Sequence, residues 1–278
     1  MKGFFKFLIV AGIILVIAGG IMFGIGIGTK AFETGDMKTN THEITEVFDN
    51  INIEIEAADI EIKAATDGNV KVECVEKERY YHEVSVLNNT LSIKCINNLR
   101  WYQKIFNFDN RKIKVVIFLV NTEYDSLNIK TSTGDVIINK EFSFNTSNIS
   151  VSTGDVNFNA AVKDTAKFEA STGNIRLSNI NSNSLDITTS TGDILITNAI
   201  INGKITLNTS TGNVIIKDSD ANTLSIKTST GDVKGNLLTG KIFKASTSTG
   251  KISTPSDDNT KGECIIETST GDIIIEVK

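Results

Sequence analysis

Proline and histidine are scarce in this chain of 278 residues, which contains one proline, Pro255, and two histidines, His42 and His82. The single proline, with few helix-forming runs beyond the N-terminus, favours strands. The two histidines lie far apart in the sequence, and neither has metal-ligand spacing around it, so we expect no metal site and no cofactor. The sequence also lacks a Ser-His-Asp set and a phosphate-binding loop that opens a helix, and we therefore expect no enzyme.

An excess of basic residues is also missing, since the formal net charge is −5. A nucleic-acid-binding protein needs a basic face, so nucleic acid is not an expected partner. Only three cysteines occur. Cys74 and Cys95 share the parity of their apolar neighbours and should point inward, either as buried free thiols or as a disulfide. Cys264 is unpaired in both cases.

Charged and polar side chains are absent from a run of 22 residues between Phe7 and Gly28. A helix of this length can cross about 30 Å of hydrocarbon. A secretory signal has a shorter apolar core of about 7–15 residues, and Gly26-Ile27-Gly28 is a poor cleavage site. We predict a transmembrane signal anchor at 7–28, with a cytoplasmic tail at 1–6, a linker at 29–44 and the C-terminal domain outside the cell membrane. Glycines at every fourth position, Gly20, Gly24 and Gly28, could let two such helices approach closely, which leaves homo-oligomerisation open.

What the chain has in abundance is one repeat, Ser-Thr-Gly-Asp or a close variant, which occurs eight times at intervals of 19 to 21 residues. The glycines are Gly134, Gly154, Gly173, Gly192, Gly212, Gly231, Gly250 and Gly271. Apolar and polar residues alternate on both sides of each glycine, which predicts a strand, a turn with φ > 0 and a second strand. The predicted fold is therefore all-β: a single-stranded parallel β-helix (β-solenoid) with about 19–20 residues per rung, each rung stacked on the last, preceded by one transmembrane helix.

The columns of the aligned repeats predict which side chains point inward. The position five before the glycine is apolar in every repeat, and the position two after it is always β-branched. The position three before it holds threonine in six repeats but Val151 and Ala170 in the others, so these threonines should point inward and bond backbone carbonyls near the corner. This orientation argues against an outward threonine array that binds ice. The Asp or Asn that follows most of the glycines is interpreted as a turn cap, because a calcium ion needs six to eight oxygen ligands.

Both ends of the repeat array differ from its middle. Residues 45–125 are predicted to form degenerate N-terminal rungs that cap the regular solenoid at 126–278, and the segment from Ile51 to Ile62 is interpreted as one rung without Ser-Thr-Gly. A candidate binding loop within this half contains the aromatic residues Trp101, Tyr102, Phe106 and Phe108. This loop is either a hydrophobic plug over the first rung or a segment that contacts a ligand or the membrane interface. The last strand, from Ile273 to Val277, should leave an open edge that is blunted by charges or accepts a partner strand.

An apolar anchor, the strand Ile-Lys-Val-Val-Ile-Phe-Leu-Val from Ile113 to Val120, and repeated Leu-x-Ile-x-Thr-Ser-Thr-Gly-Asp-Val-x-Ile units from Leu127 onward resemble a family of bacterial envelope proteins. This is the LiaG-like domain of unknown function labelled "putative adhesin", and the resemblance covers about residues 45–278. Asn121 lies where the family usually has a proline. The resemblance implies a β-solenoid at the surface of a Gram-positive cell, with no established activity.

Two hypotheses of function follow. The first is a membrane-anchored, extracytoplasmic binding or adhesion module without enzymatic activity, whose partner is a cell-wall polymer, a glycan or an envelope protein. The alternative, which the resemblance to LiaG-like proteins implies, is a structural or regulatory component of the envelope-stress response that acts through a membrane-protein partner.

Overall fold

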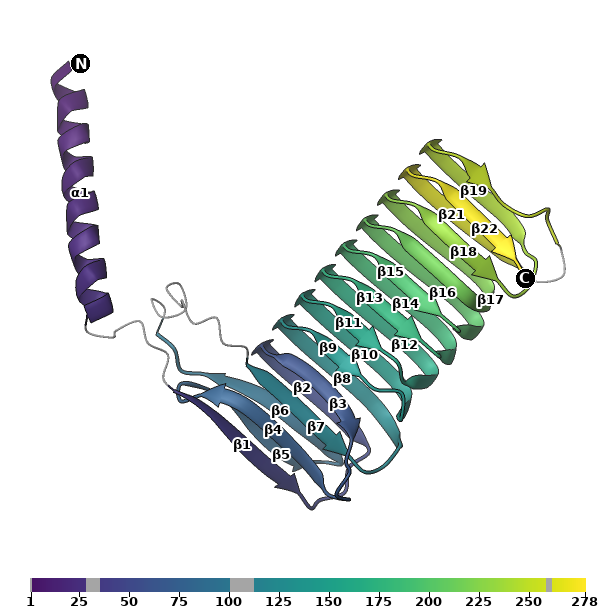
Figure 1. Ribbon diagram of the computed structural model, residues 1–278, viewed down its shortest axis with the longest axis horizontal. Helices are drawn as coiled ribbons and strands as arrows, with labels where there is room; N and C mark the ends of the chain where they lie inside the picture. Colours follow the sequence, from purple (N-terminus) through teal and green to yellow (C-terminus); the bar gives the residue numbers. More distant parts are fainter. Residues whose placement is uncertain (1, 29–35, 101–112, 259–261) are drawn as a thin grey trace.

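The computed structural model describes residues 2–28, 36–100, 113–258 and 262–278, and within these the chain is all-β apart from one N-terminal helix, α1 (Lys2–Gly28). The strands stack into an elongated rod with a smaller group of strands at its N-terminal end (Figure 1). This is a β-solenoid-like fold, as the repeat period predicts.

Each regular rung contains one strand before its Thr-Gly corner and another after it. The strands before the corners are β8 (Glu123–Thr133), β10 (Ser143–Thr153), β12 (Ala161–Thr172), β14 (Asn181–Thr191), β16 (Ile200–Thr211), β17 (Val214–Thr230), β19 (Ile242–Thr249) and β21 (Glu263–Thr270). The strands after them are β9 (Val136–Ile138), β11 (Val156–Phe158), β13 (Ile175–Ser178), β15 (Ile194–Thr197), the start of β17, β18 (Val233–Leu237), β20 (Ile252–Ser253) and β22 (Ile273–Val277). Equivalent strands pair in parallel and in register, so that Ile149 lies between Ile129 and Phe168.

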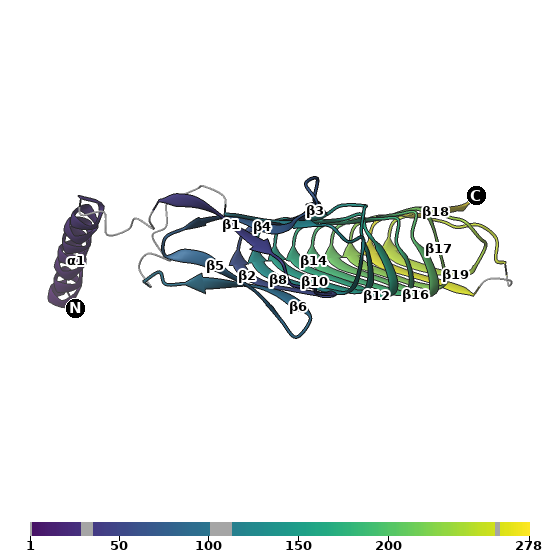
Figure 2. The same ribbon diagram turned by 90° about the horizontal axis from the view of Figure 1, so that it is seen from below.

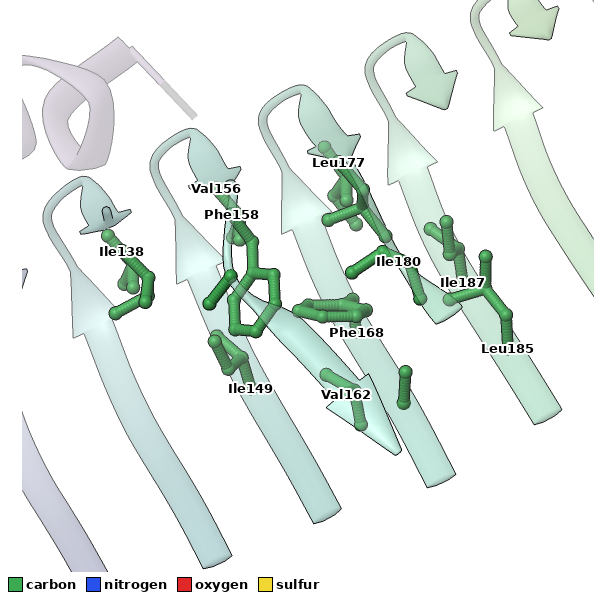
Figure 3. Close-up of a cluster of buried hydrophobic side chains, with 14 of the residues drawn as sticks. Ile138, Ile149, Val156, Phe158, Val162, Phe168, Leu177, Ile180, Leu185 and Ile187 are labelled. Carbon is green, nitrogen blue, oxygen red and sulfur yellow. The ribbon is translucent and has the colours of Figure 1, made fainter. Parts of the chain in front are cut away.

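The core of the rod is a continuous column of apolar side chains, as the alternation predicts. Ile149, Phe168 and Ile187 from successive rungs are fully buried, and so are the β-branched residues that follow the interior corners. Figure 3 shows Phe158 and Phe168 together in this column, where their ring centroids are 5.0 Å apart in an edge-to-face arrangement. Burial of such side chains in every rung supplies the main stabilising free energy, about 25 cal/mol per Å² of apolar surface.

The order of the last two rungs in space is the reverse of their order in the sequence. β21 pairs with β17 on one side and with β19 on the other, and β22 likewise lies between β18 and β20. The prediction that each rung stacks on the preceding one is therefore wrong at this end. The open edge lies on β19 and β20 (Figure 1), and not on Ile273–Val277 as the sequence suggested.

The composition of the two rungs explains this order. The displaced terminal rung has Ala245 half-buried and Ile252 47% exposed, at columns that are buried in every other regular rung. The intercalated rung offers Ile266 and Ile273, which are both fully buried. Placing the better apolar rung inside buries more surface, and the poorer one then covers the end.

A degenerate rung precedes the regular ones and stacks directly on the first of them. Its strands are β2 (Asn50–Ala57) and β3 (Asp59–Ala64), which pair in parallel with β8 and β9. Ile53 lies opposite Ile129 in this pairing. The intervening residues 65–122 are thus an insertion between two adjacent rungs.

The insertion and the residues before β2 form an N-terminal cap, which we define as β1 (Met37–Ile44), β4 (Val70–Lys77), β5 (Tyr80–Leu87), β6 (Thr90–Asn97) and β7 (Lys114–Leu119). β6 and β7 continue the parallel stack on β2 and β3, but β1–β4, β4–β7 and β5–β6 are antiparallel. A wholly parallel β-helix is therefore a wrong prediction for this end: short turns reverse the chain between β4, β5 and β6, and β1 and β7 both pair antiparallel with β4. The expected linker at 29–44 is also partly replaced, since residues 37–44 form β1.

Candidate functional site

The eight repeat glycines stack at one corner of the rod, and each has φ between +135° and +152°. A Cβ atom on Gly192 would lie 2.0 Å from the carbonyl oxygen of Gly173, and every other corner is equally tight, at 1.9 to 2.1 Å from a backbone oxygen of the adjacent rung. Glycine is required here by the conformation and by the close approach of the rungs. The glycine column is therefore a structural part of the stack and presents no side chain to a ligand.

The residue after each glycine forms a second ladder. The side-chain oxygen of one rung accepts a hydrogen bond from the backbone N–H of the next; for example, the N–H of Asn213 donates to Asp193 Oδ1 at 2.7 Å. The acceptors in spatial order are Asp59, Asp135, Asp155, Asn174, Asp193, Asn213, Asp232 and Asp272. The final donor is Lys251 in the terminal rung, which has no described rung beyond it to cap. Asp and Asn here cap backbone N–H groups, and their partners belong to the neighbouring rung.

Charge along this ladder is partly neutralised. Burial alone would raise the pKa of Asp155, but hydrogen bonds from Arg176, at 2.8 Å, and from Asn174 hold it below its ordinary value. Lys234 donates to Asp232 at 2.6 Å and lowers the pKa of that carboxyl in the same way. Because one side-chain oxygen of each member accepts a backbone N–H, the ladder is explained as backbone capping.

The threonine column points inward, as its alignment with Val151 and Ala170 predicts. Thr189 and Thr209 are buried, and each donates its hydroxyl to a corner glycine carbonyl of the adjacent rung, Gly173 at 3.3 Å and Gly192 at 3.2 Å. Thr228, Thr247 and Thr268 make the same bond. These hydroxyls are satisfied inside the stack.

The exposed hydroxyls are those of the Ser-Thr pair directly before each glycine. All eight pairs are exposed, and they form two adjacent columns along the corner. We call these columns the hydroxyl ridge: Ser132, Thr133, Ser152, Thr153, Ser171, Thr172, Ser190, Thr191, Ser210, Thr211, Ser229, Thr230, Ser248, Thr249, Ser269 and Thr270. Neighbouring rungs of a parallel stack lie about 4.8 Å apart, so the ridge offers one donor–acceptor group many times at a fixed spacing. Figure 2 shows the stack of rungs along which it runs.

The second place with unusual chemistry lies inside the cap. His82 on β5 is buried, and its Nδ1 atom lies 3.0 Å from Glu76 Oε2 on β4, which also accepts the backbone N–H of His82 at 2.7 Å. Asn40 on β1 donates to the other oxygen of Glu76. Desolvation lowers the pKa of His82 even though Glu76 opposes that shift, so the ring is neutral at pH 7.

Cys74 completes this group. One donor atom of each of Cys74, Glu76 and His82 lies within 4.8 Å of the other two, and these are the described residues whose side chains could hold a metal ion. Burial raises the pKa of the Cys74 thiol to about 12, and that of Cys264 at the other end of the rod to about 12. Both are protonated thiols at neutral pH and hence poor nucleophiles. No disulfide joins Cys74 to Cys95.

Sequence reasoning missed this cluster because His42 and His82 are separated by several strands. β1 and β5 both flank the polar interior of the cap, so both histidines line one pocket of about 450 Å³ with Asn40, Glu76 and Tyr81. A sequence signal was nevertheless present: Val72, Cys74 and Glu76 occupy every second position of one strand, so their side chains lie on the same face. The aromatic residues of the candidate binding loop, Trp101, Tyr102, Phe106 and Phe108, lie outside the described residues.

The sequence matches the Toastrack DUF4097 family over residues 48–206. This match confirms the resemblance to the β-repeat family labelled "putative adhesin". The matched range runs from the degenerate rung through the cap to the middle of the regular rungs. No curated protein matched the chain.

Several solved structures are similar at low identity. A "putative adhesin" from Parabacteroides merdae is 16% identical, with a TM-score of 0.41, covering 88% of this chain and 97% of that one. A "putative adhesin" from Bacteroides fragilis is 14% identical, with a TM-score of 0.41 and coverage of 87% and 97%. A "putative lipid binding protein" from Parabacteroides distasonis is 16% identical, with a TM-score of 0.41 and coverage of 88% and 97%.

Proposed function

The chain belongs to the Toastrack DUF4097 family, and we propose that it is a membrane-anchored binding module, outside the cytoplasm, that holds a repetitive polar partner along its rod. The observation that carries this proposal is the combination of the hydroxyl ridge with an apolar helix whose most apolar window is not buried. The ridge repeats one exposed Ser-Thr pair in all eight regular rungs. The most apolar window of α1, Gly3–Ile21, has a mean hydropathy of 2.5 and no buried residue.

The helix supports the anchoring part of the proposal. Phe4, Leu15 and Val16 are each at least 68% exposed, and apolar residues surround the helix on all sides. Such a surface is stable in hydrocarbon and costly in water. Among the residues whose burial is described, the core cluster of the rod contains none from α1, so the rod does not need the helix for its own packing.

The rod supports the binding part of the proposal. Each rung contributes a weak polar contact, and a partner with its own repeat can engage many rungs at once, which raises the overall affinity without any strong single site. A wall polymer or glycan has such a repeat. Rigid strands hold the ridge in place, so little ordering entropy is lost on binding.

The test uses residues 36–278 without the helix, because the core is independent of it. The rod should co-sediment with purified cell wall, and it should lose most of this retention when Ser171, Ser190 and Ser210 are all replaced by Glu. A matched triple change on another face, Asn181→Glu, Asn202→Glu and Asn222→Glu, adds the same charge and should retain binding. Equal retention of the two triple variants would contradict a role for the ridge.

The alternative hypothesis predicts a different result. A regulatory component that acts through a membrane protein would show no retention on wall material, while changes in α1 or the cap would alter the envelope-stress response. Absence of wall retention for the unmodified rod would therefore favour that alternative.

A further inference from the structure

The cap cluster, defined as His42, Cys74, Glu76 and His82, has a chemistry that the ladders and the ridge do not use. Its members come from β1, β4 and β5, which enclose the interior of the cap between them. Donor atoms of Cys74, Glu76 and His82 lie within 4.8 Å of one another, and all three residues are buried. Sulfur and nitrogen donors beside a carboxylate at this separation are suited to a transition metal.

The histidines carry the second observation. The side chain of His82 is fully buried, and its Nε2 atom has no hydrogen-bond partner. His42 also has a buried Nε2 without a partner. A buried polar atom left unsatisfied costs about 1–3 kcal/mol, and each such atom in a native fold needs an explanation.

Glu76 orients His82 for this purpose. With Nδ1–H donating to Glu76 Oε2, the neutral ring presents the lone pair of Nε2. Metal-binding histidines commonly donate their second ring N–H to a carboxylate in this way, which fixes the tautomer and makes the ligand more basic. Asn40 holds the remaining oxygen of Glu76 and so fixes the carboxylate as well.

An ion can reach the cluster from outside. A pocket of about 450 Å³, open to solvent, is lined by His42, Glu76 and His82. The apolar residues Val84 and Ile96 form part of its wall. The cluster is thus enclosed by protein on one side and accessible on the other.

We propose that the cap binds one Zn²⁺ ion through Cys74 and the Nε2 atoms of His82 and His42, with Glu76 as the carboxylate that orients His82. A thiolate and imidazole nitrogens suit Zn²⁺, whereas Ca²⁺ and Mg²⁺ prefer oxygen ligands alone. On binding, the Cys74 thiol transfers its proton to solvent and the sulfur forms the bond to zinc. The thiolate and the carboxylate then balance the two positive charges of the ion. Bound zinc would tie β1, β4 and β5 together.

The experiment uses the full chain in detergent micelles, stripped with a chelator and then titrated with Co²⁺ and Zn²⁺. Co²⁺ should produce a thiolate-to-metal charge-transfer band in the near ultraviolet that saturates at one equivalent of the metal. Zn²⁺ should displace the Co²⁺ and remove the band. Zinc in excess should also raise the melting temperature, because it binds only the folded cap. Absence of the band in the unmodified protein would overturn the proposal without any mutation.

Variants identify the ligands. Cys74→Ser should abolish the charge-transfer band, and His82→Gln should weaken Zn²⁺ binding at least about tenfold. Cys264→Ser is the matched control, because Cys264 is an equally buried thiol outside the cluster, and it should bind one equivalent as before. His42→Gln, at a half-buried position, provides a ligand test if a core change prevents folding. A band that survives Cys74→Ser but disappears in Cys264→Ser would contradict the assignment, as would unchanged affinity in both histidine variants.

Discussion

The regular rungs and the N-terminal cap differ in how they satisfy buried polar groups. In the rungs, one bond is repeated many times: a threonine hydroxyl to a glycine carbonyl, or an Asp or Asn oxygen to the N–H of the next rung. In the cap, buried polar groups that are hydrogen-bonded have individual partners, such as Tyr80 with Ala57 and Glu76 with His82. Repetition tolerates variation in one rung, because the neighbours keep the stack in place. The cap has no second copy of any of its contacts.

The largest expected loss of stability is for a glycine at a corner of the regular rungs, compared with a glycine in a turn of the cap. Gly192→Ala would put a Cβ 2.0 Å from a backbone oxygen at φ +148°, and the rungs would have to separate to relieve the clash. We expect a loss of about 4 kcal/mol or more in the free energy of unfolding, measured by urea denaturation followed by circular dichroism. Gly68→Ala in the cap is the control: its φ is +75°, nothing lies within 4 Å, and the loss should be about 1 kcal/mol. Equal losses would show that close approach is unimportant at the corner.

A second pair of changes compares hydroxyl groups. Tyr80→Phe removes the oxygen that accepts the Ala57 N–H at 2.7 Å and donates to the Ala57 carbonyl at 3.2 Å, so the loss should be about 2 kcal/mol. Thr189→Val removes one hydroxyl from a column that already tolerates Val151, and it should cost about 1 kcal/mol or less. Thermal melting of both variants tests the ranking. A larger loss for Thr189→Val would reverse the contrast between cap and rungs.

The smallest effect tests the spatial order of the rungs. Asp193→Ala leaves the N–H of Asn213 without its side-chain acceptor and should cost about 1 kcal/mol. Lys251→Ala, at the same column of the terminal rung, removes a side chain that caps no described rung and should change stability by less than about 0.5 kcal/mol. If the rungs stacked in sequence order, position 251 would be interior, and a change to Asp would stabilise the protein by supplying the missing acceptor.

Much of the regular array could be predicted because each rung is specified by residues that are close together in the sequence. The alternation around Ile149 or Ile187 specifies which side chains enter the core, and the glycine spacing specifies the rung. The inward threonines followed from a single comparison with Val151 and Ala170. The hydroxyl ridge follows from the same columns, although its exposure on the corner is clear only in the structure.

The cap could not be predicted in the same way, because its contacts join strands that are distant in the sequence. His42 is brought to His82 only when β1 pairs with β4 and β4 turns back into β5. Spacing rules for metal ligands assume that the ligands lie on one or two local elements, so two histidines forty residues apart gave no signal. Cys74 and Glu76 share one strand face with the apolar Val72, which indicates that this face points inward. The pattern does not indicate which residues of other strands lie opposite it.

By itself the sequence determined an all-β solenoid with glycine corners, an inward threonine column and an apolar N-terminal helix, because periodic burial is encoded residue by residue. Only the tertiary structure decided that the last rung is inserted before its predecessor, that the cap contains antiparallel strand pairs, and that Cys74, Glu76 and His82 converge inside it. The physical reason is that rungs with the same repeat can each stack on the same neighbouring rung, so the repeat alone does not specify their order. Differences such as Ala245 against Ile266, or Lys251 against Asp272, affect stability only once the rungs are stacked.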